Sequence, residues 1–169
     1  MRVAVLTISD RSYHGERADR TGPAVADAVR RLLPGASVVE QTILPDERDD
    51  IEWNLKRLAD TSAADLVLTA GGTGLSPRDV TPQATRAIAD SEVPGLGVAM
   101  RAATRAALPA AILSRQVAAV RERTLVVNLP GSPRGAVECL EVVANVLAHA
   151  IATLRDEARD AHPARIETA

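Results

Sequence analysis

The sequence predicts an α/β fold with three layers, in which helices cover both faces of a mostly parallel central sheet. Apolar runs short enough for strands alternate with segments of helical periodicity, and this order favours right-handed βαβ units. The first apolar run, Val3–Ile8, is nearly continuous, which is typical of a parallel strand buried on both faces. Aromatic residues make up only 1% of the chain, so the core must consist of Val, Leu, Ile and Ala.

The composition is that of an ordinary globular protein, with 46% hydrophobic and 25% charged residues in a chain of 169. This length predicts a single domain, which we place at residues 1–155, followed by a polar tail at residues 156–169. The net charge of −2 gives no global reason to expect nucleic-acid or membrane binding. The single cysteine, Cys139, excludes an intrachain disulfide and is predicted to be a small core residue.

The chain contains no segment that resembles a targeting signal or a membrane span. The first predicted strand begins at Arg2 without a preceding signal sequence. The longest uncharged apolar-rich run, Val142–Leu154, is too short and too polar to cross a bilayer. We therefore expect a cytoplasmic protein.

The first half of the chain supplies two predicted strands and two predicted helices. A strand at Val3–Ile8 is followed by residues 13–20, which are polar and contain a glycine, as in a surface loop. A helix begins at Thr21 with a following Gly and Pro, and Pro34-Gly35 ends it. A second strand at Val38–Leu44 precedes another helix with apolar residues on its inner face.

The middle of the chain is less regular. A third strand includes Leu66–Leu68, and helices are predicted at Gln83–Ala89 and from Gly95 to about Ala107. Within residues 109–123, the pieces 111–113 and 117–120 could form short strands of a hairpin or of a sheet edge.

The last predicted strand is Thr124–Leu129, and the loop Pro130-Gly131-Ser132-Pro133 follows it. A long helix comes next, and from Arg155 onward the chain becomes charged, as in a fraying helix end. The apolar residues that this helix is expected to bury are Val137, Leu140, Val143, Leu147, Ile151 and Leu154.

A glycine-rich stretch, Thr69–Pro82, joins the third strand to the next helix. Three glycines within four residues allow the backbone to approach a ligand closely. The residues that could bind a phosphate or a metal here are Gly71, Gly72, Thr73, Gly74, Ser76, Arg78 and Asp79. The alternative is a tight turn in which the glycines only supply positive φ angles.

Four predicted loops follow the carboxyl ends of strands. They are Ser9-Asp10, Pro45-Asp46, Gly71 to Asp79, and Pro130 to Pro133. In an open parallel sheet these ends share one edge, where ligands bind. We therefore expect one site with backbone amides for phosphate and carboxylates for a divalent cation.

Several better-known sites are excluded by their missing residues. A P-loop requires a lysine after its last glycine, but the only lysine, Lys56, lies in a predicted helix. A dinucleotide fingerprint would need a small residue where Pro77 stands. A hydrolase triad lacks an obvious histidine, because His14, His149 and His162 lie in a loop, an apolar helix and the tail.

Two aspartates, Asp46 and Asp79, are the candidate metal ligands. Each alone is more simply explained as a turn residue or an ion-pair partner. Together at strand ends they suit Mg²⁺, which binds one or two carboxylates together with substrate phosphates in phosphoryl or nucleotidyl transfer. Arg78 could neutralise developing charge, or it could form an outward salt bridge.

The chain resembles the molybdopterin adenylyltransferase family of molybdenum-cofactor biosynthesis, which includes the amino-terminal domain of gephyrin. The resemblance covers about residues 3–152. The motifs that carry it are Leu6-Thr7-Ile8-Ser9-Asp10, Asp19-Arg20-Thr21-Gly22-Pro23, Leu44-Pro45-Asp46-Glu47, Thr69 to Thr85, Pro94-Gly95-Leu96-Gly97 with Met100-Arg101, Ile112-Leu113-Ser114-Arg115 and Asn128 to Pro133. It implies the α/β fold of that family, usually as a trimer, and transfer of AMP from Mg-ATP to molybdopterin with release of pyrophosphate.

The resemblance also implies roles for particular residues. The two essential aspartates of the family match Asp46 and Asp79, and its substrate-binding glycine loop matches residues 71–74. The segments around Ser9-Asp10 and Gly131-Ser132 match the lining of the same pocket. Because the chain lacks an insertion domain, molybdate insertion is expected in a separate protein that receives the product.

Two alternatives remain at this stage. The family contains paralogues of unclear catalytic status, so the chain could be a non-catalytic scaffold that binds molybdopterin. It could also be a nucleotide hydrolase that acts on another pyrophosphate. The presence of both Asp46 and Asp79 favours the transferase.

Overall fold

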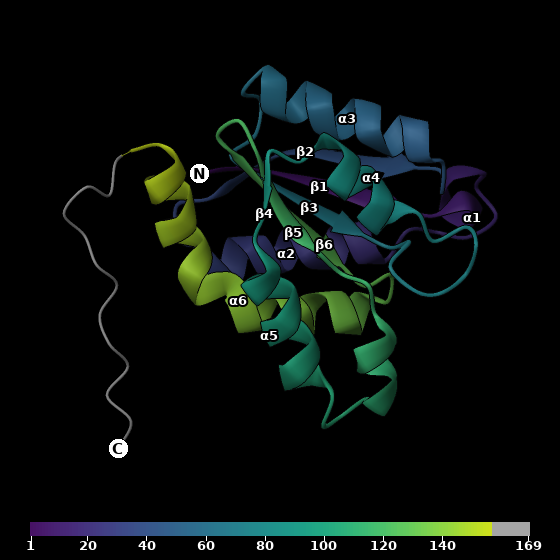
Figure 1. Cartoon of the computed structure of the whole chain (residues 1–169). Helices are drawn as coiled ribbons and strands as arrows, with labels where there is room; N and C mark the ends of the chain where they lie inside the picture. The colour runs from purple at the N-terminus through teal and green to yellow at the C-terminus, as the bar shows by residue number, and fades with distance from the viewer. Residues whose placement is uncertain (157–169) are drawn as a thin grey trace.

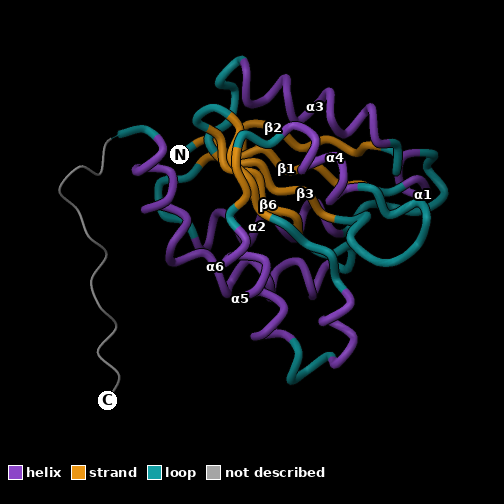
Figure 2. The backbone as a smooth tube through the Cα atoms, in the orientation of Figure 1, coloured by secondary structure: helices purple, strands orange, loops and turns teal. Residues whose placement is uncertain are grey.

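The computed structural model describes residues 1–156 and contains a six-stranded mixed sheet between two layers of helices (Figures 1 and 2). The strands are β1 (Arg2–Ile8), β2 (Ser37–Leu44), β3 (Leu66–Ala70), β4 (Ser91–Glu92), β5 (Ala118–Arg121) and β6 (Thr124–Leu129). The helices are α1 (Asp10–Tyr13), α2 (Thr21–Leu32), α3 (Arg48–Asp60), α4 (Thr81–Ile88), α5 (Pro94–Thr104), the 3₁₀ helix η1 (Pro109–Leu113) and α6 (Pro133–Leu154). The predicted fold class is confirmed.

The sheet has the order β2-β1-β3-β6-β5-β4. The neighbouring strands β2, β1, β3 and β6 are parallel to one another, whereas β5 runs antiparallel to both β6 and β4. The carboxyl ends of β2, β1, β3 and β6 therefore lie along one edge of the sheet.

The continuous apolar runs are explained by the two helical layers. Along β1, Val3 and Val5 belong to the core beneath α2 and α6, whereas Ala4 and Leu6 belong to the core beneath α3 and α4. Successive side chains of a strand point to opposite faces, so a strand covered on both sides is apolar at nearly every position. Figure 1 shows α3 and α4 on one face, and α2, α5 and α6 on the other.

Helix α6 is long and apolar enough to cross a membrane, judged by length and composition alone. In this fold it is a core helix, because a row of its residues packs against the sheet. The buried residues of α6 are Ala136, Cys139, Leu140, Val143, Ala144, Leu147 and Ile151. Cys139 is thus a core residue as predicted, whereas Val137 and Leu154 are only partly buried.

The sequence prediction was wrong for residues 111–113, which belong to η1 and not to a strand. Pro109 is at the start of this helix, and its ring favours a helical first turn. The neighbouring piece 117–120 was closer, because β5 begins at Ala118. Its hairpin partner is β6, reached through Glu122 with a φ of +52°, and its other neighbour is the unpredicted β4.

The predicted division into a domain at 1–155 and a tail at 156–169 stays a prediction. Residues 157–169 of that tail lie outside the described residues.

Candidate active site

A cleft of about 940 Å³ opens at the carboxyl ends of the four parallel strands. The sheet order changes direction between β1 and β3, and ligands of open α/β sheets bind at such a switch point. All four predicted loops contribute to its lining, which includes Ser9 and Asp10 after β1, Asp46 after β2, Gly71, Gly72 and Asp79 after β3, and Gly131 and Ser132 after β6. The predicted convergence of these loops is confirmed.

Asp46 and Asp10 hold each other in place across the ends of β2 and β1. The backbone N–H of Asp10 donates to Asp46 Oδ2 at 2.8 Å, and the backbone N–H of Asp46 donates to Asp10 Oδ1 at 2.9 Å. These reciprocal bonds orient the Asp46 carboxylate and leave its second oxygen, Oδ1, near Gly72.

The surroundings of Asp46 disfavour its negative charge. Burial raises the pKa of the Asp46 carboxyl, and the negative charges of Asp10 and Asp79 raise it further. The hydrogen bond from Asp10 and the charge of Arg78 oppose this shift without cancelling it. A raised carboxyl pKa in a cleft is typical of a functional site, since a cation arriving there would relieve the repulsion.

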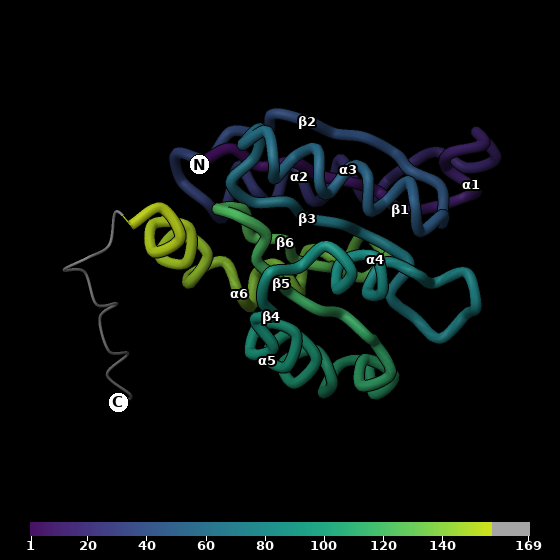
Figure 3. Tube along the Cα trace, turned by 45° about the horizontal axis from the view of Figure 1, so that its top comes forward, coloured from purple at the N-terminus to yellow at the C-terminus, as the bar shows by residue number. Residues whose placement is uncertain are grey.

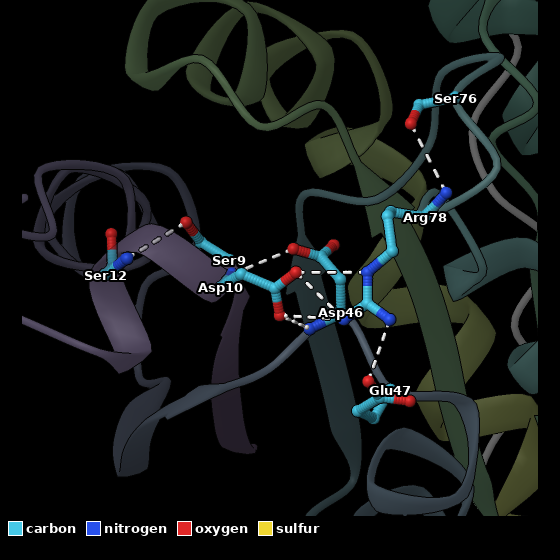
Figure 4. A network of polar contacts seen from close by, with 7 residues as sticks. All are labelled: Ser9, Asp10, Ser12, Asp46, Glu47, Ser76 and Arg78. Carbon is cyan, nitrogen blue, oxygen red and sulfur yellow. Dashed lines mark hydrogen bonds and ion pairs between the residues drawn. The ribbon is translucent and has the colours of Figure 1, made fainter. Parts of the chain in front are cut away.

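Arg78 forms ion pairs on the outer side of the site (Figure 4). Its guanidinium lies 2.9 Å from Asp10 Oδ2 and 2.8 Å from Glu47 Oε1. Burial alone would raise the pKa of Asp10, but the Asp46 hydrogen bond and Arg78 bring it below its ordinary value. Of the two roles left open for Arg78, the structure contains the salt bridge, and Arg78 does not line the cleft.

Gly71 and Gly72 adopt backbone conformations that other residues rarely take, with φ angles of +124° and +61°. A Cβ on Gly71 would lie 2.1 Å from the carbonyl oxygen of Ile8. A Cβ on Gly72 would lie 2.3 Å from Thr81 Oγ1. The backbone therefore makes the predicted tight turn, and Gly71 and Gly72 also line the cleft.

Asp79 closes an exposed loop whose shape depends on its own carboxylate. Asp79 Oδ2 accepts a hydrogen bond from the Ser76 backbone N–H at 2.8 Å, and the Asp79 N–H donates to the Ser76 carbonyl at 2.9 Å. Ser76 is exposed and does not line the cleft, and its Oγ accepts a hydrogen bond from the Arg78 backbone N–H at 3.3 Å. Ser76 thus shapes the loop that presents Asp79.

A second hollow of about 390 Å³ adjoins the glycine loop. Three of the predicted substrate-binding residues line this hollow and not the cleft, namely Thr73, Gly74 and Pro130. Ser132 borders both spaces. Much of the remaining wall is apolar and includes Leu75, Leu108 and Leu113. The predicted substrate-binding residues are therefore divided between the cleft and this second hollow, except for Ser76 and Arg78, which line neither.

Three arginines in the cleft were missed by the sequence reasoning. Arg11, Arg17 and Arg20 line its wall and form no ion pair with any residue in the described range 1–156. They come from α1 and from the stretch that was predicted only as a surface loop. Their density just after a strand end was the available signal. Unpaired guanidinium groups suit the binding of phosphate oxygens.

Asp19 and Thr21 fasten this arginine-bearing segment to the sheet edge. Asp19 Oδ2 accepts from Thr7 Oγ1 at 2.8 Å, and its Oδ1 accepts from the Thr21 N–H at 2.8 Å. Thr21 Oγ1 donates to the Gly131 carbonyl at 2.9 Å, linking the segment to the loop after β6. The segment is therefore fixed to strand β1 and to the loop after β6.

The chemistry of the carboxylates fits a magnesium ion that is shared with a substrate. No group of three or more His, Cys, Asp or Glu side chains among the described residues is arranged to hold a metal by itself. Asp46 and Asp79 each use Oδ2 for a backbone N–H, which leaves Oδ1 of each for a cation. Mg²⁺ commonly binds through one or two carboxylates with phosphates and waters, so these two residues would suffice alongside a nucleotide.

Comparison with known sequences gives one consistent result. A family model described as "Probable molybdopterin binding domain" matches residues 4–149. The chain is 43% identical over 155 residues to the molybdopterin adenylyltransferase of Escherichia coli K12, covering 89% of this chain and 80% of that one. It is 41% identical over 143 residues to the molybdopterin adenylyltransferase of Helicobacter pylori J99, covering 85% and 81%.

Solved structures agree with the sequence matches. The molybdopterin biosynthesis enzyme MoaB from Thermus thermophilus is 48% identical, with a TM-score of 0.83 over 92% of this chain and 96% of that one. The molybdopterin biosynthesis Mog protein from Mycobacterium ulcerans is 36% identical, also with a TM-score of 0.83, over 90% and 98%. The whole of the cleft lies within the matched residues 4–149.

Proposed function

The chain belongs to the family of probable molybdopterin binding domains, and on that premise we propose that it is a molybdopterin adenylyltransferase of molybdenum-cofactor biosynthesis. The observation that supports this most directly is that one cleft contains both Asp46 and Asp79 and three arginines, Arg11, Arg17 and Arg20, which form no ion pair with any of residues 1–156. Carboxylates can hold a cation and guanidinium groups can bind phosphates, and both stabilise the charge that nucleotidyl transfer has to handle.

In the proposed reaction, the terminal phosphate of molybdopterin attacks the α-phosphorus of ATP. A bond forms between a phosphate oxygen of the pterin and the α-phosphorus, while the bond from that phosphorus to the bridging oxygen breaks. Pyrophosphate leaves with the electron pair of the broken bond. Such transfers depend mainly on positioning and charge neutralisation, and no protein nucleophile is needed.

Residues of the chain supply the positioning. Asp46 and Asp79 would hold Mg²⁺, which would neutralise negative charge on the phosphates when bound. Arg11, Arg17 and Arg20, which line the same cleft, bind phosphate oxygens. The backbone at Gly71 and Gly72 approaches the substrate without a side chain in between.

The chain also acts as a homotrimer in the cytoplasm and passes its product to a separate molybdate insertion protein; these are parts of the same proposal. Large apolar side chains that are more than half exposed on α5, on η1 and next to η1 support an assembly, and these are Val98, Leu108, Ile112 and Leu113. Light scattering of the purified protein should give three times the 17.8 kDa mass of one chain.

The decisive experiment incubates the purified chain with molybdopterin, ATP and Mg²⁺ and measures pyrophosphate and adenylylated pterin. We expect equal amounts of both products, and none when any one of the three components is omitted. Tight pterin binding without pyrophosphate would favour the non-catalytic scaffold instead. Loss of ATP without molybdopterin would favour the nucleotide hydrolase.

A further inference from the structure

Asp79 is carried by a loop that has little support of its own. Between Gly74 and Asp79 the chain is exposed and contains no helix or strand, and Figure 3 shows the connection from β3 to α4 extending away from the sheet. We call residues 74–79 the Asp79 loop. A carboxylate that takes part in catalysis must be held within a fraction of an ångström, so something outside this loop has to hold it.

Arg115 holds both ends of the Asp79 loop. Its Nε donates to the carbonyl oxygen of Gly74 at 2.7 Å, and its Nη2 donates to the carbonyl oxygen of Asp79. Its own backbone N–H donates to the carbonyl oxygen of Thr73 at 2.9 Å. One residue thus contacts three carbonyls that lie 36 to 42 positions earlier in the chain.

The chemistry of arginine suits this contact. A guanidinium has several donors in a rigid plane, so two of them can reach carbonyls at the two ends of a loop. Hydrogen bonds from a charged donor are about twice as strong as neutral ones. Arg115 is partly buried and lines neither hollow, so it acts through the loop and does not touch the substrate.

We propose that Arg115 is a positioning residue of the transfer reaction, because its guanidinium fixes the Asp79 loop and so sets where the Asp79 carboxylate lies relative to Asp46. This inference rests on the proposed function. The role of Arg115 differs from that of Arg78, because the Arg78 guanidinium pairs with the carboxylates of Asp10 and Glu47, whereas the Arg115 guanidinium bonds to backbone carbonyls of the loop.

The first test compares Arg115→Met and Arg115→Lys with the control Arg121→Met. Arg121 is also partly buried and also donates to a backbone carbonyl, that of Ile88, but it lies beside Thr124 at the amino end of β6, whereas the Asp79 loop follows the carboxyl end of β3. We expect Arg115→Met to lower kcat about 10- to 100-fold with a smaller change in KM, in line with a misplaced catalytic group. Arg115→Lys should recover part of the loss, and Arg121→Met should lower the melting temperature with kcat unchanged.

The second test asks whether Arg115 acts through Asp79. If it does, adding Arg115→Met to an Asp79→Asn variant should cause little further loss of kcat, because the group being positioned is already gone. If the double variant lost kcat by the product of the two single losses, the two residues would act independently and the proposal would be overturned. So would a kcat for Arg115→Met that equals that of Arg121→Met.

Amide hydrogen exchange provides a readout that does not depend on activity. The amides of Ser76 and Asp79 are hydrogen-bonded within the loop, so they should exchange faster in Arg115→Met and at the wild-type rate in Arg121→Met. Unchanged exchange in Arg115→Met would overturn the role of Arg115. A wild-type chain that releases no pyrophosphate would instead overturn the proposed function.

Discussion

The buried Asp65 and the partly buried Asp46 lie at opposite ends of the parallel strands, and the charges around them differ. Asp65 precedes β3 at the amino ends of the strands, where Arg2 and Arg155 pair with it. Asp46 follows β2 at the carboxyl ends, where its close charged neighbours include Asp10 and Asp79. One carboxylate is surrounded by cations of the protein, whereas the other is crowded by further carboxylates.

The pKa values follow this difference. Burial alone would raise the pKa of Asp65, but hydrogen bonds and charges from Arg2, with the charge of Arg155, bring it below its ordinary value. Burial raises the pKa of Asp46, and its acidic neighbours add to the shift. A buried carboxylate whose charge is satisfied by the protein stabilises the fold. One whose charge is not satisfied indicates a place for a cation from outside.

The largest expected effect separates the two ends by function. Asp46→Asn and Asp79→Asn should each lower the rate of adenylyl transfer about 100-fold or more, while the melting temperature stays near that of the wild type. For Asp46→Asn it should stay level or rise, because the variant removes a charge that folding disfavours. Pyrophosphate release and calorimetry measure the two quantities.

Asp65→Asn is the matched variant at the other end. It should lower the free energy of unfolding by about 1 to 3 kcal/mol, since hydrogen bonds to charged partners are lost, and leave kcat unchanged where the protein is folded. Full activity in either cleft variant, or an inactive but folded Asp65→Asn, would break the distinction between the two ends.

A smaller effect tests how closely the backbone is fitted at the cleft. Gly72→Ala should reduce stability by more than the roughly 1 to 2 kcal/mol cost of a left-handed residue, because its Cβ would meet Thr81 Oγ1. It should also lower kcat, since the same Cβ would lie 3.2 Å from Asp46 Oδ1. Gly35→Ala is the control, with a φ of +76° and no atom within 4 Å of the new Cβ. It should show the backbone cost alone, and equal kcat values for the two variants would contradict the prediction.

The smallest effect is the dependence on acid. The folded pKa of Asp65 lies below its ordinary 3.8, so its stabilisation is present above that pH and is lost as pH falls through the folded value. The pKa of Asp46 lies above 3.8, so as the pH falls the Asp46 carboxylate is protonated before that of Asp65. Activity should therefore fall at a higher pH than unfolding followed by circular dichroism. Asp65→Asn should make the free energy of unfolding depend less on pH in the acid range. If activity and folded structure were lost at the same pH in the wild type, the prediction that activity is lost first would be wrong.

Much of the cleft could be predicted because it depends on strand ends. The apolar runs of β1, β2, β3 and β6 are strong local patterns, and parallel pairing brings their carboxyl ends to one edge whatever the details of packing. Asp46 follows from that geometry once β2 is placed, whereas Asp79 lies at the end of a loop whose position also depends on Arg115. The short β4 and the 3₁₀ helix η1 were not predictable, because two exposed residues and a proline-led turn have no periodic signal.

The positions of individual side chains could not be predicted in the same way. Arg17 and Arg20 were predicted to lie in an exposed loop, and only the hydrogen bonds of Asp19 hold that loop as a wall of the cleft. Thr73, Gly74 and Pro130 were predicted to bind the substrate together with the cleft residues, yet in the folded chain they line the second hollow.

The glycine loop shows both what the local sequence determines and what only the tertiary structure decides. Its residues already require a close backbone turn after a buried strand, because local chain geometry depends on neighbours in sequence. The distances from Gly71 to Ile8 and from Gly72 to Asp46, and the bonds from Arg115 to the Asp79 loop, join segments that are 26 or more residues apart in the sequence. No periodicity encodes such contacts, since they arise only when the sheet and both helical layers are packed together.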